Sequence, residues 1–226
     1  MEPNVRTISH SQVGTRAGLG TNSVLRNTYL LLSMTLLFSA ATAGFAMATQ
    51  APMLNIWIVL IGYFGLLFLT HTLRNSAWGI AAVFALTGFM GYTLGPILNA
   101  YISHFANGAQ LVAYAFGATG VSFVGLSAYA VVSRKDFSFM RGFLFVGILV
   151  AFIAGIANIW LAIPALALAV SSMFVFLMAG YILWQTSEIV HGGETNYILA
   201  TVSLYVAIYN MFTSLLHLFG VFGGDE

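Results

Sequence analysis

The sequence of 226 residues contains no cysteine and very few charged side chains. Without cysteine the chain forms no disulfide, no thiolate metal site and no cysteine nucleophile. Seven Arg and Lys and six Asp and Glu make up 6% of the residues, against about 25% in an ordinary soluble domain. A soluble protein of this size needs more polar groups to cover its surface, and a net charge of +1 supplies no basic patch for nucleic acid. With 60% hydrophobic residues, the chain is expected to be an integral membrane protein whose surroundings are the lipid bilayer, with no nucleic-acid partner.

The gaps between charged residues predict the number of membrane spans. Residues 27–73, 75–133 and 142–187 contain no Asp, Glu, Lys or Arg and are each long enough for two spans, whereas residues 195–224 hold one, because a spanning helix needs about 20 residues. The sequence therefore predicts an all-α membrane protein with seven transmembrane helices. Polar residues and prolines divide the gaps into residues 27–48, 53–73, 77–102, 109–132, 141–159, 162–184 and 196–219.

The positions of Arg and Lys predict the orientation and the domain organisation. All seven fall on one side of the seven-helix arrangement, and positive loops stay in the cytoplasm. We therefore expect a cytoplasmic N-terminus and a C-terminus outside. Residues 1–26 are polar and are expected to form a flexible cytosolic tail, and residues 27–222 are expected to form the transmembrane domain.

Small and polar residues form a narrow stripe along the last predicted helix. At 100° per residue, the members of the stripe lie within about 40° of Ser203; they are Asn196, Ser203, Ala207, Asn210, Ser214 and His217. Lipid does not favour such segregation, so we expect this helix to be packed in the bundle. The stripe fits hydrogen-bonded helix packing and a polar conduit about equally well, and Asn210 is a candidate binding residue.

In the third predicted helix, Gly88, Gly91 and Gly95 share one face and are followed by Pro96 and Asn99. Small residues let a neighbouring backbone approach closely, and the proline predicts a kink. Close helix packing is the favoured interpretation of this face.

Two opposite charges are predicted at the same membrane depth. Arg74 ends the second helix and Glu188 ends the sixth, with Gln185 on the same face as Glu188. Either the two charges pair across the cytosolic mouth of the bundle, or each is solvated at the interface. Arg74, Gln185 and Glu188 are candidate binding residues together with Asn210.

The sequence offers little for an enzyme. The segment from Gly120 to Gly125 misses the spacing of a nucleophile elbow by one residue, and His-Glu-x-x-His is not found. We therefore predict no enzymatic activity, no cofactor and no metal site.

Several motifs resemble the Bax-inhibitor-type (TMBIM) membrane family. They are Gly88-Phe-Met-Gly91-Tyr-Thr-Leu-Gly95-Pro96-Ile97, Asp136-Phe137, Tyr181-Ile-Leu-Trp184, and Leu204-Tyr205 with Asn210. The stretch from Thr186 to Tyr197 is most similar to the bacterial branch whose members modulate the FtsH membrane protease. This resemblance implies a multi-pass inner-membrane protein that binds an FtsH-type protease complex and restrains it.

Another branch of the family is a pH-sensitive calcium leak and gives the alternative function, a calcium or proton pathway through the bundle. The resemblance implies that an arginine and two proton-sharing aspartates serve that leak. The arginine matches Arg74, but the aspartates fall on Gln185 and Ala207. Neither residue titrates, so the paired carboxylates that raise one another's pKa are missing.

Overall fold

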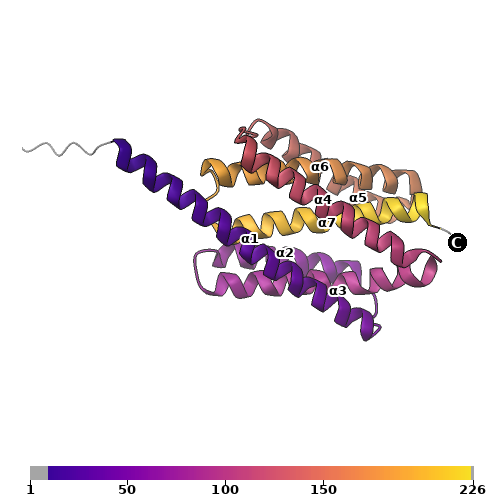
Figure 1. Cartoon of the computed structure of the whole chain (residues 1–226). Helices are drawn as coiled ribbons and strands as arrows, with labels where there is room; N and C mark the ends of the chain where they lie inside the picture. The colour runs from indigo at the N-terminus through magenta and orange to yellow at the C-terminus, as the bar shows by residue number, and fades with distance from the viewer. Residues whose placement is uncertain (1–9, 225–226) are drawn as a thin grey trace, which may run out of the picture.

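The computed structural model describes residues 10–224, with side chains from Ser23 onward. It consists of seven α-helices (Figure 1), each with a stretch long and apolar enough to cross a membrane. They are α1 (His10–Ala48), α2 (Ile56–Leu73), α3 (Trp78–His104), α4 (Gly108–Ser133), α5 (Met140–Leu161), α6 (Pro164–His191) and α7 (Tyr197–Gly223). The predicted all-α fold with seven spans is confirmed.

The two largest differences from the predicted boundaries are at the start of α1 and the end of α6. α1 begins at His10, so residues 10–26 of the predicted tail are helical; residues 1–9 lie outside the described residues, and flexibility of the tail stays a prediction. α6 continues to His191, beyond the predicted end at 184. The added turns include Gln185, Thr186 and Ser187, which are buried in the bundle, so tertiary packing carries this helix past its apolar stretch.

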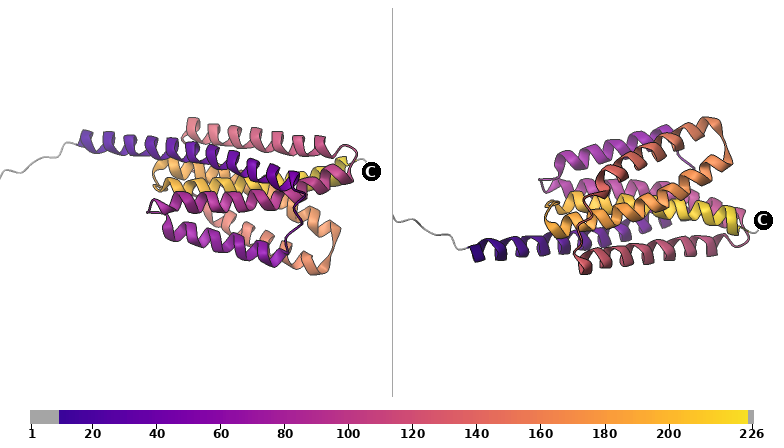
Figure 2. Two further views of the ribbon diagram at one scale, coloured as in Figure 1. Left: turned by 90° about the horizontal axis from the view of Figure 1, so that it is seen from below. Right: turned by 90° about the horizontal axis from the view of Figure 1, so that it is seen from above.

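Helix α7 runs through the middle of the bundle, between α1, α2 and α3 on one side and α4, α5 and α6 on the other (Figures 1 and 2). It packs against α1, α3, α4 and α6. Ala207 is fully buried and Ser214 is 8% exposed, so neighbouring helices cover the predicted stripe at these two positions. The prediction that this helix is packed in the bundle is confirmed.

A buried tyrosine joins three helices at the centre. The hydroxyl group of Tyr205 on α7 donates to the carbonyl oxygen of Thr87 on α3 at 3.2 Å and lies 2.6 Å from the hydroxyl oxygen of Ser39 on α1. Because the single hydroxyl proton of Tyr205 is used on Thr87, Ser39 is the donor in the shorter bond. The core thus has a polar centre in which both hydroxyl groups are satisfied.

The glycine face of α3 packs against α1. A Cβ atom at Gly91 would collide with the carbonyl oxygen of Ser39 and the side chain of Thr42, and one at Gly95 would collide with Ala46 and the carbonyl oxygen of Ala43. Asn99 Nδ2 also donates to the Met47 carbonyl oxygen at 3.0 Å. The predicted role of this face in close packing is confirmed. α3 continues through Pro96 as one helix.

Helices α2 and α5 lie at the edge of the bundle, on the same side (Figure 2, right). α2 packs mainly along α3, and α5 along α6. The two edge helices meet through aromatic rings, with centroid distances of 6.2 Å for Trp57 and Trp160 and 5.7 Å for Phe64 and Phe152. These contacts lie toward the end of α2 that is far from Arg74.

The termini of the described chain lie at opposite ends of the bundle (Figure 1), as an odd number of spans requires. If the end with Arg74 is cytosolic, alkaline phosphatase fused to the C-terminus is active, because this enzyme folds only after export. A fusion made at Ser138, in the loop between α4 and α5, is then the inactive control. Activity only in the Ser138 fusion would reverse the orientation.

Replacement of Gly91 by alanine tests the contact between α1 and α3. We expect Gly91→Ala to lower the free energy of unfolding by about 1–3 kcal/mol, because backbone atoms of α1 must move. Gly117→Ala on α4 is the matched control, since a Cβ atom there meets nothing within 4 Å. Thermal unfolding in detergent measures both, and equal melting temperatures would contradict the proposed close contact.

Candidate functional site

All charged side chains within residues 23–224 lie at one end of the bundle, which we call the charged end. It consists of the start of the spanning part of α1 and the loops that follow α2, α4 and α6. The charged residues are Arg26, Arg74, Arg134, Lys135, Asp136, Arg141, Glu188 and Glu194.

The end of α6 holds the loop between α4 and α5. The hydroxyl group of Ser187 donates to the carbonyl oxygen of Lys135 at 3.0 Å and accepts from the backbone N–H of Phe137 at 3.2 Å. The ring of His191 lies between two carbonyl oxygens, 2.8 Å from that of Ser187 and 3.1 Å from that of Arg134. The two Ser187 bonds and the contact of His191 Nε2 with the Arg134 carbonyl oxygen fix the loop on α6.

Asn196 connects the start of α7 to the loop between α2 and α3. Its Oδ1 atom caps α7 by accepting from the N–H groups of Ile198 and Leu199, as an N-cap asparagine does. Its Nδ2 atom donates to the carbonyl oxygen of Arg74 and to Asn75 Oδ1, both at 3.0 Å. The segment from Ser187 to Asn196 therefore ties together two other loops of the charged end.

Helix α6 ends at Gly192, which has a left-handed backbone conformation, and the carboxylate of Glu188 lies against this end of the helix. Gly192 has φ of 78°, and the Gly193 N–H donates to the carbonyl oxygen of Glu188 at 2.8 Å. The carboxylate of Glu188 accepts from Trp184 Nε1 at 3.1 Å and lies where a Cβ atom at Gly193 would be. Glu188 is thus held within the α6 terminus.

The hypothesis that Arg74 and Glu188 pair is not borne out in this conformation. Within residues 23–224 no ion pair joins them: Arg74 Nη1 lies 3.0 Å from Nε2 of His71, one turn earlier in α2, and Glu188 bonds to Trp184. Arginine has only donors, so His71 accepts. Each of the two side chains thus has a hydrogen-bond partner three or four residues away in its own helix.

The other predicted site residues lie apart. Gln185 is 4% exposed on α6, one turn before Glu188. Asn210 lies on α7 roughly 20 Å from Asn196 at 1.5 Å per residue, and its Nδ2 donates to the carbonyl oxygen of Val206 in its own helix. The structure therefore does not gather the four residues into one site.

The loop between α4 and α5 carries an acid with a perturbed pKa. The backbone N–H of Ser138 donates to Asp136 Oδ1 at 2.8 Å. This bond, helped by the Ser138 side chain and by His191, holds the pKa of the exposed Asp136 below its usual value. A lowered pKa means that this turn is stabilised above the unfolded-state pKa and loses that stabilisation as the pH falls through the folded-state value.

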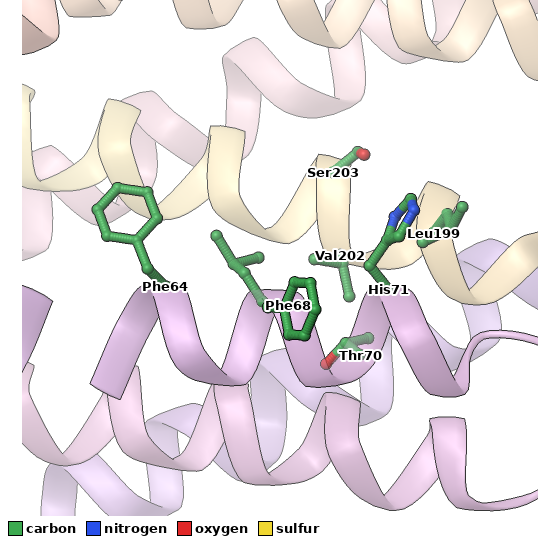
Figure 3. Close-up of a pocket in the computed structure, with 8 residues that line it drawn as sticks. Phe64, Phe68, Thr70, His71, Leu199, Val202 and Ser203 are labelled. Atoms are coloured by element: carbon green, nitrogen blue, oxygen red, sulfur yellow. The ribbon is translucent and has the colours of Figure 1, made fainter. Parts of the chain in front are cut away.

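Cavities flank the bundle toward both of its ends. One, of about 560 Å³, lies between α2 and α7 near the charged end and is drawn in Figure 3. Another, of about 430 Å³, lies at the opposite end between the α1–α2 connection and α3. Across residues 10–224, no three His, Asp or Glu side chains gather into a group able to hold a metal ion.

Comparison with known protein families shows which family the chain belongs to. Residues 21–224 match the family described as Bax1-I, inhibitor of apoptosis-promoting Bax1. The chain belongs to the Bax inhibitor family. The resemblance inferred from its motifs is confirmed over all seven spans.

Close relatives from bacteria match nearly the whole chain. An uncharacterized protein of Pseudomonas aeruginosa is 52% identical over 91% of this chain and 92% of its own length. The "Modulator of FtsH protease YccA" of Escherichia coli K12 is 50% identical over 92% of this chain and 94% of its own length. An equally similar protein of another Escherichia coli strain is called "Inner membrane protein YccA". With its seven spans, the chain is a multi-pass protein of the bacterial inner membrane.

Sequence reasoning missed the residues that organise the charged end. Ser187, His191 and Asn196 carry its cross-links, and only Asn196 had a usable signal, since an asparagine just before an apolar run indicates an N-cap. The partners of Ser187 and His191 lie more than 50 positions away in the chain and leave no local pattern.

Replacing Asn196 separates its two roles. Asn196→Asp keeps the cap but loses both donor bonds, so we expect a loss of about 1 kcal/mol in the free energy of unfolding; Asn196→Ala also loses the cap, for a loss of about 2 kcal/mol. The exposed neighbour substitution Thr195→Ala is the control. Thermal unfolding in detergent ranks the three variants. An Asp variant as stable as the wild type would show that the bonds to Arg74 and Asn75 contribute nothing.

Proposed function

We propose that this protein is a regulatory subunit that binds an FtsH-type, ATP-dependent membrane protease and modulates it, without enzymatic activity of its own. The observation that carries this proposal is the 50% identity to the "Modulator of FtsH protease YccA" over 94% of that protein. The match covers 92% of this chain, so it is not confined to a few of the apolar helices.

The construction of the charged end supports a binding role. Its loop between α4 and α5 is held by Ser187 and His191, yet presents Lys135 and Asp136 exposed and Phe139 with 78% of its surface exposed. A fixed loop binds a partner without paying a large ordering entropy, and an exposed aromatic side chain is a typical interface anchor. If this end is cytosolic, it is the face that an ATP-driven protease domain can reach.

The interior supports a regulator better than a catalyst. His217 on α7 is 2.8 Å from the hydroxyl group of Ser171 on α6, but all three described acids lie at the charged end. A histidine that activates a serine is normally oriented by a carboxylate, and none of the described acids is at that depth. The Ser171–His217 bond therefore serves helix packing.

Co-purification with the protease tests the proposal. We expect crosslinking of native membranes to recover the protease with the wild-type chain, and Phe139→Ala to lower recovery about fivefold, as for an interface anchor. Phe222→Ala is the matched control, because Phe222 is 77% exposed at the opposite end of the bundle. Absence of the protease from the wild-type sample would refute the function. Equal recovery with Phe139→Ala would refute only the proposed face.

A calcium or proton pathway remains the alternative proposal, favoured by the half-buried polar side chains of Ser203 and Asn210 on α7. A titrating carboxylate pair is what the family's leak branch uses, and this chain has Gln185 and Ala207 at those positions. We therefore expect proteoliposomes to show no calcium flux above that of empty vesicles between about pH 6 and 8. Calcium flux that changes with pH in this range would support the leak function and would mean that other groups of the chain titrate.

A further inference from the structure

The cavity between α2 and α7 is an apolar groove with polar groups at one end. Its walls are Phe64, Leu67 and Phe68 on α2 and Leu199 and Val202 on α7. Figure 3 shows Phe64 and His71 pointing from α2 toward α7, with His71 beside Leu199. Thr70, His71 and Ser203 make the end of the groove nearest to Arg74 polar.

The groove opens sideways to the bilayer. α2 is an edge helix that packs mainly along α3, and Phe64 and Phe68 are 47% and 74% exposed. At the depth of a membrane span the surrounding medium is hydrocarbon. An acyl chain lying in the groove therefore gains dispersion contacts with these walls.

The groove has room for a single acyl chain. An acyl chain is much thinner than an α-helix, which is about 10 Å across, and the volume of about 560 Å³ admits it without movement of α2.

A positively charged side chain, that of Arg74, lies at the polar end of the groove. Arg74 Nη1 is 3.0 Å from Nε2 of His71, and His71 lines the groove. Within residues 23–224, both glutamates of the charged end have other partners: Glu188 accepts from Trp184 Nε1, and Glu194 accepts from the Asn196 N–H at 2.7 Å. The guanidinium group thus has a histidine, and no carboxylate of the described residues, as its side-chain partner, and its charge is available to an anion.

We propose that the groove between α2 and α7 binds one acyl chain of an anionic phospholipid, with the lipid phosphate held by Arg74 beside His71. Basic pockets between spans on the cytoplasmic side bind such headgroups, and a guanidinium group can donate two parallel hydrogen bonds to a phosphate. The ligand class is a phospholipid with net negative charge, such as phosphatidylglycerol or cardiolipin. This site is distinct from the proposed protease-binding loop.

Photoactivatable lipids in proteoliposomes test the site. The full-length protein is reconstituted with phosphatidylglycerol or phosphatidylcholine, each carrying the same diazirine-labelled acyl chain, and labelled peptides are mapped by mass spectrometry. We expect labelling of residues 64–71 and 199–203 by phosphatidylglycerol to exceed that by phosphatidylcholine about fivefold, the effect of one basic residue. Arg74→Gln abolishes this preference, whereas Arg74→Lys keeps most of it.

Two variants separate lipid binding from folding. Arg141→Gln removes an exposed cation at the same end and should keep the preference. Leu199→Trp fills the groove, leaves Arg74 in place and should lower labelling of residues 64–71 by both lipids. Equal labelling by the two lipids in the wild type, or an unchanged preference in Arg74→Gln, would overturn the proposal. Crosslinking of the groove to another protein in native membranes, in place of lipid, would overturn it in favour of a partner helix.

Discussion

The bilayer offers no hydrogen-bond partner at the depth of the spans, so a polar side chain there is stabilised when it finds a partner within the protein. Tyr205 on α7 does so by bonding to Ser39 on α1 and to the carbonyl oxygen of Thr87 on α3. This stabilisation favours a place for α7 in the middle of the bundle, because only a central helix has neighbours for polar groups on several faces. Close approach of α1 and α3 then depends on Gly91, where any side chain would collide with the backbone beside Ser39.

At the charged end, backbone carbonyl groups in the loops also need hydrogen-bond partners within the protein. The carbonyl oxygens of Arg74 and Lys135 follow helix ends and have no partner inside a helix, and the side chains of Asn196 and Ser187 supply one to each. The connection between α6 and α7 thus holds the two neighbouring loops, and the end of the bundle becomes one surface. Its exposed groups, among them Lys135 and Phe139, therefore have a defined arrangement that a partner protein can recognise.

Composition and spacing were enough to predict the seven spans, the inward α7 and the glycine packing of α3, because these follow from local periodicity and from the sparse charges. Charge sign and depth alone left open whether Arg74 and Glu188 pair or are solvated separately. They took no account of His71 and Trp184, each within one helical turn, which bond to those groups in the structure. The contacts of Ser39 with Tyr205 and of His191 with Arg134 join segments far apart in the chain, and no local pattern encodes them.

The position of α7 also bears on where function can reside. In the middle of the bundle Ala207 is fully buried and Gln185 is 4% exposed, and neither can exchange a proton. The described acids, Asp136, Glu188 and Glu194, all belong to the charged end, outside the apolar interior. The groups able to bind a partner therefore lie at the surface. They are the loops proposed to contact a protease, and Arg74, which lies beside the groove proposed to hold a lipid. Because Asn196 bonds to the carbonyl oxygen of Arg74, and Ser187 and His191 bond to the loop between α4 and α5, Arg74 and that loop are held by the same connection between α6 and α7.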